Sequence, residues 1–420
     1  MLKRIAAIVF IFFCTAIAWG ILGGTIFSRT YSDQNQRMSG TVESNWGSPQ
    51  TQTPPAAAYS VSQTKTDARV EDGKAISRTV TEWVPVSLPL ERSRVDVTLN
   101  LNHRQKGLLW YSTFAVNFSG VYTYRNPSDQ PQAVTFILDF PAAQAIYDDL
   151  TVLIDGNPAS ITTGSGRATA TATIAGSHTA VLTFGYRSQG LGSWNYRFAG
   201  DAASGGVSQV KDFVLSMHTN FKAIDFPQNT LSATEKRETE AGWDLTWSYK
   251  NLLSGLQIGM TMPEKLQPGP LAGEISFFAP VSLFFFFFLM FILTTLRDID
   301  LHPMNYFFLA TAFFAFHLLL AYLVDHISIH LAFVICSIVS IFLVVSYLRL
   351  VVGMRFAAVE AGGAQLLYLV LFSYAFFFKG FTGLAITIGS ILTLFAVMQM
   401  TGRINWREKF AAMGAPGKWK

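Results

Sequence analysis

Apolar residues gather into six long stretches, one close to the start of the chain and five that follow one another after residue 275. The stretches cover residues 5–27, 276–296, 303–324, 329–352, 365–378 and 381–400. A helix needs about 20 apolar residues to cross the roughly 30 Å core of a bilayer. Five such runs joined by short loops leave no polar face for water, which argues against a buried soluble core. The pattern predicts six transmembrane helices.

The first stretch has two interpretations, a retained anchor or a cleaved signal peptide. The apolar part of a signal peptide spans only about 7–15 residues, and this stretch is longer. Gly20, Gly23 and Gly24 are small residues of the kind found at a cleavage site. A cleaved signal peptide is therefore the alternative interpretation. Cys14 follows two phenylalanines, unlike the small residues that precede a lipoprotein cysteine. We therefore interpret residues 1–27 as an anchor.

Positive charge on the short loops sets the predicted orientation, because basic residues accumulate on the cytoplasmic side. With Lys3 and Arg4 in the cytoplasm, six crossings return the C-terminus to the same side. The inner loops and the tail then hold Arg297, Arg349, Arg355, Arg403, Arg407, Lys409, Lys418 and Lys420. The short outer loops hold only Lys379. Both termini are thus predicted to be cytoplasmic, and the long middle segment lies outside.

The middle segment is polar and falls into two parts. Residues 28–79 are rich in Ser, Thr, Gln and Pro, a composition typical of a flexible tether. From residue 80 onwards apolar and polar residues alternate, as in residues 114–124. Turn signals such as that of residues 155–158 separate the alternating runs. Residues 80–274 are therefore predicted to form an antiparallel β-sandwich.

Aromatic residues of this outer region offer one recognition site. Trp194, Tyr196, Trp243 and Trp247 would form a platform for a glycan or a peptide. Aromatic residues at strand spacing more often pack in a core, so both interpretations stay open.

Catalytic and ligand-binding motifs are sparse. The chain has no Cys-x-x-Cys pair, no His-Glu-x-x-His helix, no Gly-x-Ser-x-Gly elbow and no phosphate loop, which excludes an ATP-driven transporter within this chain. Its cysteines, Cys14 and Cys336, both lie in predicted spans, so no disulfide holds the outer domain. The net charge of +4 is accounted for by the loops, which argues against nucleic-acid binding. We expect no catalytic residue, cofactor or metal.

Four polar residues in or beside the spans are functional candidates, because ionisable groups in a membrane usually serve a function. His317 lies inside the third span, where the alternative is a helix–helix hydrogen bond. Asp325, His326 and His330 lie at the next outer turn. His326 and His330 would share a helical face if the fourth helix began early, and with Asp325 they would bind a metal or sense pH. The alternative is a hydrated turn in which Asp325 caps the helix.

Asp298 and Asp300 form a pair of carboxylates, the type of catalytic group that aspartyl proteases use. Intramembrane aspartyl proteases carry their two aspartates on different helices within the membrane. Here both fall on one short loop, which argues against proteolysis.

Short motifs at the turns of the helical region carry a family resemblance. They are Asp300-Leu301-His302-Pro303-Met304-Asn305-Tyr306, Asp325-His326-Ile327, Tyr347-Leu348-Arg349 and Thr401-Gly402-Arg403-Ile404-Asn405-Trp406. In this order they resemble the C-terminal membrane region of the CreD family of bacterial inner-membrane proteins, over residues 296–406. The matching positions are His302, Pro303, Asp325, His326, Arg349, Arg403 and Trp406. Pro303 stands where a helix would begin.

The resemblance implies a multi-pass inner-membrane protein associated with envelope integrity, colicin tolerance and the response to cell-wall stress, and it brings no catalytic residues. The expected class is an α + β integral membrane protein. Its parts are an anchor (1–27), a flexible polar linker (28–79), a periplasmic antiparallel β-sandwich (80–274), a bundle of five transmembrane helices (275–402) and a basic cytoplasmic tail (403–420).

We expect a non-enzymatic protein, held in the lipid bilayer, whose periplasmic domain recognises an envelope protein or glycan. We expect it to need no cofactor and to bind no nucleic acid. The sequence is compatible with a homo-oligomer. One alternative is a transporter or channel subunit, with His317 and the residues of the outer turn along its path. A second is a membrane-embedded hydrolase or protease.

Overall fold

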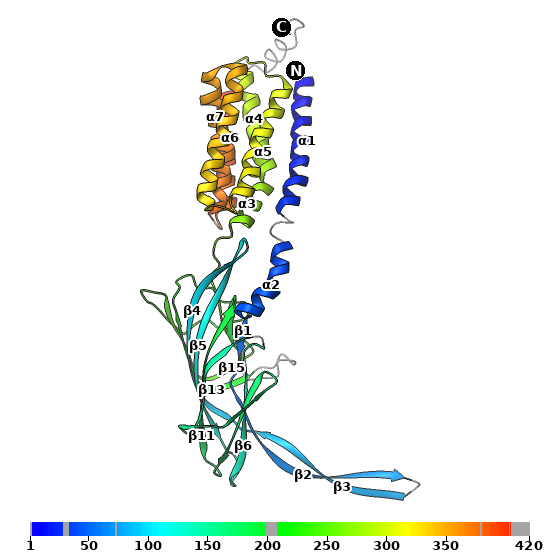
Figure 1. Cartoon of the computed structure of the whole chain (residues 1–420), viewed down its shortest axis with the longest axis vertical. Helices are drawn as coiled ribbons and strands as arrows, with labels where there is room; N and C mark the ends of the chain where they lie inside the picture. The colour runs from blue at the N-terminus through cyan, green and yellow to red at the C-terminus, as the bar shows by residue number, and fades with distance from the viewer. Residues whose placement is uncertain are drawn as a thin grey trace. The chain divides into compact units, whose positions relative to one another are not determined.

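A computed structural model describes residues 2–27, 33–71, 74–143, 145–198, 208–378, 380–402 and 404. The chain divides into two compact units (Figure 1). The helical unit comprises Met1–Arg37 and Leu266–Lys420, and the β unit comprises Met38–Lys265. An N-terminal apolar helix, a large β-sheet domain and five apolar helices near the C-terminus of the described chain confirm the predicted membrane α + β class.

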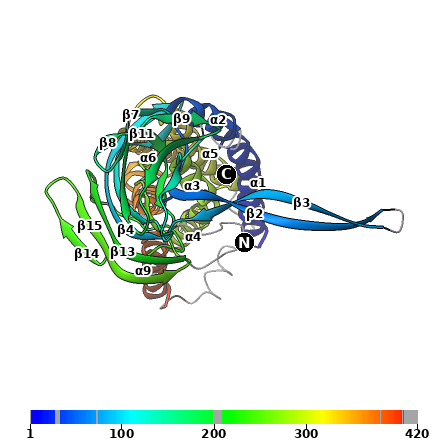
Figure 2. The ribbon, with the colours of Figure 1, turned by 90° about the horizontal axis from the view of Figure 1, so that it is seen from below.

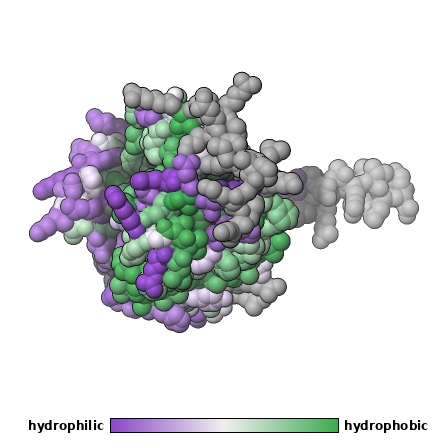
Figure 3. All heavy atoms as spheres, turned by 90° about the horizontal axis from the view of Figure 1, so that it is seen from above, coloured by the Kyte–Doolittle hydropathy of each residue, from purple (hydrophilic) through white to green (hydrophobic). Residues whose placement is uncertain are grey.

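The described part of the helical unit holds six helices that are long and apolar enough to cross a bilayer. They are α1 (Leu2–Phe27), α4 (Ala279–Leu296), α5 (Pro303–Leu323), α6 (Ile329–Val352), a segmented helix over Phe356–Phe377, and α9 (Thr382–Thr401). The segments are η2 (Phe356–Ala361), α7 (Gly362–Gln365), η3 (Leu366–Leu371), α8 (Phe372–Tyr374) and η4 (Ala375–Phe377). A short helix, α3 (Pro268–Phe277), precedes α4. Seen from above, hydrophobic residues cover much of the visible face (Figure 3).

The second predicted span is broken into α3 and α4. The break falls at Phe278, two residues before Pro280. Proline has no backbone donor and disfavours helical geometry in the residue before it, so it belongs in the first turn of a new helix.

The fifth span is longer than predicted, because it begins at Phe356 rather than at residue 365. Glu360 made the added turns look like a loop, but its carboxylate pairs with Arg297 at the end of α4. Two π-helical segments, η2 and η3, interrupt the regular helix, and such bulges often occur at functional sites.

The phenylalanine run on α4 shows how packing orients an entirely apolar helix. Phe286 and Phe287 are buried in the bundle, whereas Phe284 and Phe288 are 51% and 37% exposed. Neighbours in a helix lie about 100° apart, so a continuous run covers every side. Neighbouring helices therefore select which side chains form the core, and the others face outwards.

The described strands of the β unit form three sheets, which Figure 2 shows from below. One has the order β1 (Gln50–Gln52), β12 (Ser193–Tyr196), β16 (Ile258–Thr261). The second has the order β3 (Lys74–Ser87), β2 (Ala56–Glu71), β6 (Gln132–Asp139), β10 (Arg167–Ile174), β9 (Ile161–Gly164). The third has the order β14 (Glu235–Glu238), β15 (Trp243–Ser254), β13 (Ser208–Thr219), β4 (Leu90–Lys106), β5 (Leu109–Arg125), β11 (Thr179–Leu191), β7 (Tyr147–Ile154), β8 (Asn157–Pro158). The ladders are antiparallel except for the parallel pairs β1–β12 and β4–β13.

The core of the β unit follows from the alternation along its central strands. On β5, Phe114, Val116 and Phe118 are buried, whereas Asn117 and Ser119 point to solvent. Successive residues of a strand face opposite sides of the sheet, so the apolar set of each strand lies on one side. That side packs into a single cluster to which β4, β5, β11 and β13 all contribute.

The prediction of a flexible linker over residues 28–79 is wrong for the part that the structure describes. Residues 33–71 form α2 (Asp33–Trp46), β1 and β2, and the rest belongs to β3. The polar composition predicted a solvated linker, but two of its polar residues, Gln50 and Gln52, are fully buried. The Gln50 amide donates to Ser188 Oγ at 2.9 Å, and the Tyr186 hydroxyl donates to Gln52 Oε1 at 2.9 Å. Buried amides with such partners act as core residues.

Strands β2 and β3 form a long two-stranded ribbon that leaves the body of the β unit (Figures 1 and 2). Only Ala56–Ala58 of β2 pairs with β6, whereas the β2–β3 ladder continues to Glu71 opposite Lys74. The described side chains from Ser60 to Lys65 are exposed. The outer ribbon is therefore supported by its own ladder alone among the described strands.

Candidate functional site

The β unit contains a cleft of about 250 Å³. Its lining comes from the β1–β2 and β3–β4 connections and from β4, β12 and β13: Pro54, Pro89, Leu90, Ser93, Tyr196, Phe198, Gln209, Val210, Lys211 and Phe213. The floor is aromatic, with the Phe213 ring centroid 5.0 Å from that of Phe198 and 5.7 Å from that of Tyr196. Gln209 and Lys211 are the exposed polar residues of the lining. An apolar floor with a few polar groups is typical of a small-ligand site.

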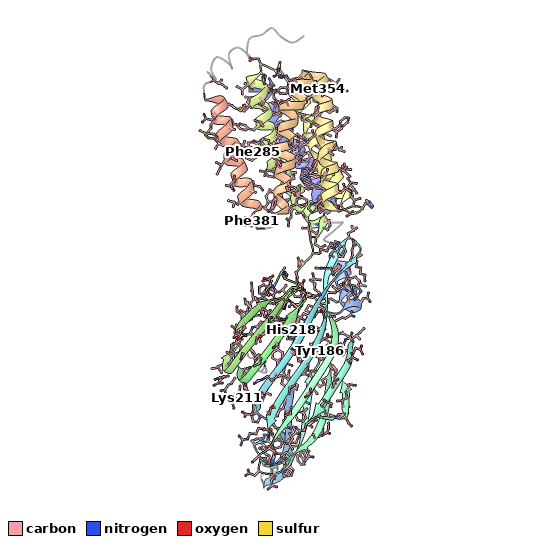
Figure 4. The ribbon with its side chains drawn as sticks, turned by 90° about the vertical axis from the view of Figure 1, so that its left-hand side faces the viewer. Tyr186, Lys211, His218, Phe285, Met354 and Phe381 are labelled. Carbon is pink, nitrogen blue, oxygen red and sulfur yellow. The ribbon has the colours of Figure 1, made fainter. Side chains whose placement is uncertain are left out.

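An irregularity of β13 at Asp212 shapes this cleft. Lys211 pairs with Asn251 and Phe213 with Tyr249, so the register is the same on both sides, and the ladder skips Asp212 and Lys250. Asp212 has a positive φ of 40°, which interrupts the regular alternation of the strand. Val210 and Phe213 are both buried while Lys211 stays exposed, as Figure 4 shows for Lys211.

Two arginines of β4 bind the carboxylate of Asp212. Nη2 of Arg94 lies 2.6 Å from Oδ1 of Asp212, and Nε of Arg92 lies 2.6 Å from Oδ2. The hydrogen bonds from Arg94 and then Arg92 lower the pKa of Asp212. A carboxylate that remains charged keeps both contacts, so Asp212 links β13 to β4 beside the cleft.

The polar groups of the cleft differ in character. Lys211 Nζ lies 3.5 Å from Glu91 Oε1, an exposed pair that a ligand anion would displace at little cost. The Tyr196 hydroxyl lies 3.4 Å from that of Tyr122, and burial raises the pKa of Tyr196 well above its ordinary value. Tyr196 thus remains neutral, and Lys211 is the charged group at the opening.

The predicted aromatic platform is not on the surface. Trp194, Tyr196 and Trp247 are buried in the core, with at most 1% of each exposed. Trp243 packs partly against that core and donates from Nε1 to the Lys222 carbonyl at 3.0 Å. The alternative interpretation, in which the aromatic residues pack in the core, is therefore correct for Trp194, Tyr196 and Trp247. Tyr196 alone also reaches the cleft.

His317, on α5, is fully buried in the helix bundle. Nδ1 lies 3.5 Å from Ser276 Oγ of α3, and Nε2 has no hydrogen-bond partner among the described residues. The rings of Trp19, Phe313 and Phe316 surround it at centroid distances of 5.0–5.8 Å. This is the geometry of a helix–helix contact.

The outer turn does not bring its three candidates together as a metal site. Helix α6 begins at Ile329, after Ser328 in the N-cap position, so His326 lies outside the helix that carries His330. The His330 ring instead packs on Phe377 at 5.1 Å. Within the described chain, no cluster of three His, Cys, Asp or Glu residues has the arrangement of a metal site. Ser328, rather than Asp325, occupies the predicted capping position.

The inner turn ties three helices together. Asp300 Oδ1 accepts a hydrogen bond from Arg4 Nη1 of α1 at 2.9 Å. His302 is the N-cap of α5, and its Nδ1 accepts from the Met304 backbone N–H at 3.2 Å. Pro303 is the first residue of α5, as the sequence indicated.

Arg349, one of the residues that match the CreD pattern, lies in the last turn of α6, where a cation complements the helix dipole. Arg403 and Trp406 fall outside the described residues.

A buried polar contact between α6 and the segmented helix was not predicted. Gln365 Nε2 donates to Ser340 Oγ at 2.8 Å, and Ser340 Oγ donates to the Ala312 carbonyl of α5 at 2.9 Å. Gln365 and Ser340 are fully buried. Gln365 appeared in the sequence only as a polar residue at the start of a short span, so no signal pointed to its partner.

These features define a helical membrane protein that carries a β-sheet domain with a cleft. Residues 276–407 match the family model described as inner membrane protein CreD. This match confirms, for the C-terminal membrane region, the resemblance that the turn motifs carry. A search of curated proteins finds no match.

Solved structures give only remote likenesses. A Legionella pneumophila protein described as nutrient binding shares 11% identity at a TM-score of 0.29, over 54% of this chain and 80% of that one. An M1 zinc metallopeptidase from Deinococcus radiodurans shares 10% identity at a TM-score of 0.25, over 41% of this chain and 42% of that one. At such TM-scores neither likeness bears on function.

Proposed function

We propose that this protein supports cell-envelope integrity without catalysis, by recognising an envelope component through the cleft of its β unit. The β unit then lies on the periplasmic side, and the helices anchor it in the inner membrane. The observation that carries the proposal is the cleft itself, with an aromatic floor of Phe198 and Phe213 and a single cation, Lys211, at its opening.

The chemistry of the cleft favours an amphipathic ligand. An apolar group would cover the aromatic floor, where burial contributes roughly 25 cal/mol per Å². An anionic or polar group would reach Lys211, whose present partner Glu91 lies 3.5 Å away. Envelope lipids, glycan precursors and peptide termini all combine such groups.

The test places a photo-crosslinking amino acid in the full-length protein in living cells. At Gln209, on the edge of the cleft, we expect adducts with an envelope component. The matched control is Asn117, an exposed residue on the outer face of β5, where we expect none. Adducts of the same kind and yield from both positions, or none from Gln209 in cells that need the protein, would contradict recognition at the cleft.

A second measurement checks the location on which the proposal depends. Asn117→Cys and Asp298→Cys, each in a chain whose Cys14 and Cys336 are replaced by Ala, place single reactive groups on the β unit and on the loop after α4. In cells with a permeabilised outer membrane, an impermeant thiol reagent should label the first and not the second. Labelling of Asp298→Cys alone would reverse the predicted orientation.

A further inference from the structure

The end of the β4–β5 hairpin projects beyond the rest of its sheet (Figure 1). The ladder between β4 and β13 reaches only to Leu99, and the ladder between β5 and β11 only to Thr113. Strands β4 and β5 remain paired with each other up to Lys106 and Leu109. A two-stranded hairpin is marginally stable alone in water, so residues 102–112 depend on what covers their two faces.

One face of this hairpin is covered by the segment through which the chain enters the β unit. The ring of Trp46, the last residue of α2, lies against two cations, with Arg104 Cζ at 5.7 Å and Lys106 Nζ at 5.8 Å from its centroid. The Tyr111 ring packs edge-on against Trp46 at a centroid distance of 6.2 Å. Arg104 and Tyr111 are partners in the β4–β5 ladder, so these contacts lie on one side of the hairpin.

The opposite face is covered by the segment through which the chain leaves the β unit. The Pro263 carbonyl accepts a hydrogen bond from Ser112 Oγ at 2.7 Å and lies 2.9 Å from Nε2 of His103. Nζ of Lys265 lies 3.4 Å from the centroid of the Trp110 ring. His103 and Ser112 are ladder partners, and Trp110 is two residues from Ser112, so all three share this face.

The two ends of the β unit therefore hold the same hairpin between them. On one side the chain comes from the apolar helix α1 through α2, and on the other only Leu266 and Gln267 separate Lys265 from α3. We propose that this end of the hairpin lies in the headgroup layer of the bilayer that the helices span, and binds phospholipid phosphates there. The hairpin surface that makes this contact comprises Trp46, Arg104, Lys106, Leu108, Trp110 and Lys265.

The side chains of the hairpin surface have the composition of a membrane–water interface. Trp46 and Trp110 are partly exposed, and amphipathic tryptophan rings collect at the level of the headgroups. Leu108, also partly exposed, stands in the turn after Gly107, which has a positive φ of 60°. An apolar residue at a tip flanked by cations fits the boundary between acyl chains and phosphates.

The cations of the hairpin surface favour phosphate as the group that is bound. Arg104, Lys106 and Lys265 each lie over an aromatic ring, and a cation in that position keeps N–H donors that point away from the ring and bind phosphate. Glu43 and Glu264 are the acidic residues closest to the surface in the sequence, so one positive charge is in excess. Anionic lipids attract such a surface, and phosphatidylglycerol is therefore the lipid of choice for a test.

Fluorescence quenching in proteoliposomes of phosphatidylcholine and phosphatidylglycerol tests the contact. Leu108→Cys in the full-length chain, with Cys14 and Cys336 replaced by Ala, carries a fluorophore, and a nitroxide on a lipid headgroup is the quencher. The matched control is Asn157→Cys at the β7–β8 turn, which lies near Tyr122 of β5, about 40 Å along the strand from Leu108. We expect quenching of the label at position 108 and none at position 157. Equal quenching at both positions, or none at position 108, would overturn the proposal.

Charge variants separate phosphate binding from packing of the hairpin. Arg104→Gln, Lys106→Gln and Lys265→Gln together should lower quenching at position 108 by about half, because the attraction to anionic lipid is lost. Arg104→Lys, Lys106→Arg and Lys265→Arg together keep the charge and should keep the quenching. A loss of equal size in both triple variants, or no loss in the glutamine variant, would contradict phosphate binding.

A second triple variant controls for the overall charge of the β unit. Lys222→Gln, Lys236→Gln and Lys250→Gln remove three exposed cations that lie outside the hairpin surface. Quenching at position 108 should stay at the level of the parent chain. A decrease as large as that of the glutamine variant of the hairpin surface would show that net charge, rather than this surface, sets the contact.

Discussion

Oδ1 of Asp244 lies 2.7 Å from Nδ1 of His218, on neighbouring strands β15 and β13. The other ring nitrogen, Nε2, lies 3.3 Å from Oδ2 of Asp96 on β4, and Arg237 of β14 stands opposite Asp244 in the ladder. Figure 4 shows His218 on β13. A histidine that donates to two carboxylates must carry both protons, so this contact joins three strands most strongly when the ring is charged.

The first prediction concerns the pH dependence of this contact. The hydrogen bond with Asp244 raises the pKa of His218, partial burial opposes the shift, and the charge of Asp96 adds to it. A raised folded-state pKa gives stability that is complete below about pH 6.5 and is lost as pH rises through that pKa. His218→Gln should lower the unfolding free energy by about 0.5 kcal/mol at about pH 5.5, a small value because solvent screens this partly exposed site, and by almost nothing at about pH 9.

Thermal unfolding of the full-length protein in detergent measures the difference between wild type and variant at each pH. Asp244→Asn provides the control, because it removes the largest cause of the shift and should show the same trend. A cost of His218→Gln that stays constant across the two pH values would contradict the assignment.

The second prediction concerns Asn126, which is fully buried after β5. Nδ2 faces the carbonyls of Gln130, Ile174 and Ala175 at 3.1 Å each, and Oδ1 accepts from the Ser128 backbone N–H at 3.0 Å. Asn126→Ala leaves these groups without partners and should cost about 2–3 kcal/mol.

Asn126→Asp distinguishes lost hydrogen bonds from lost volume. It keeps the shape but sets an oxygen against carbonyl oxygens, so the loss should equal or exceed that of the alanine variant. Asn117→Ala, on an exposed face, should change the unfolding free energy by less than about 0.5 kcal/mol. Chemical denaturation of the three variants checks the order, and a mild Asn126→Asp would show that volume dominates.

Most of the membrane region was predictable because lipid exposure demands long apolar runs, whatever their contacts. The prediction failed where a polar residue was satisfied by a distant partner. Glu360 pairs with Arg297 across 63 positions of sequence, and Gln50 pairs with Ser188 across 138. Both looked like loop residues because a single sequence does not reveal such partners.

The cleft was unpredictable for a related reason. It depends on the irregularity of β13 at Asp212, and in the sequence that residue looks like an ordinary polar position in an alternating strand. The positive φ of Asp212 and its salt bridges with Arg92 and Arg94 are visible only in the structure. Alternation correctly predicted the strands of the β unit but gave no sign of where the alternation of β13 is interrupted.

The third prediction concerns the contact between Gln365 and Ser340. Ser340→Ala leaves the Gln365 amide without its partner inside the bundle and should cost about 1 kcal/mol, the scale of a hydrogen bond between membrane helices. Gln365→Met removes the whole amide, including Oε1, which has no partner among the described residues. It should cost less than Ser340→Ala, although it changes the larger side chain. Thermal unfolding in detergent checks the order, and a larger loss for Gln365→Met would show that Oε1 is satisfied by water or lipid.

The last prediction concerns His317 and separates an anchoring bundle from a transport path. The ring is fully buried among aromatic residues, and Nε2 has no partner among the described residues. Leucine fills a similar space and leaves only Ser276 Oγ without its weak 3.5 Å contact. If the bundle acts as an anchor, His317→Leu should leave unfolding within about 0.5 kcal/mol of wild type and preserve tolerance of cell-wall stress. A proton or ion path would instead need the titratable ring, so lost tolerance in a stable, normally abundant His317→Leu protein would favour transport. His330→Leu is the matched control, because its ring packs on Phe377 at the end of the bundle and should be neutral in both measurements.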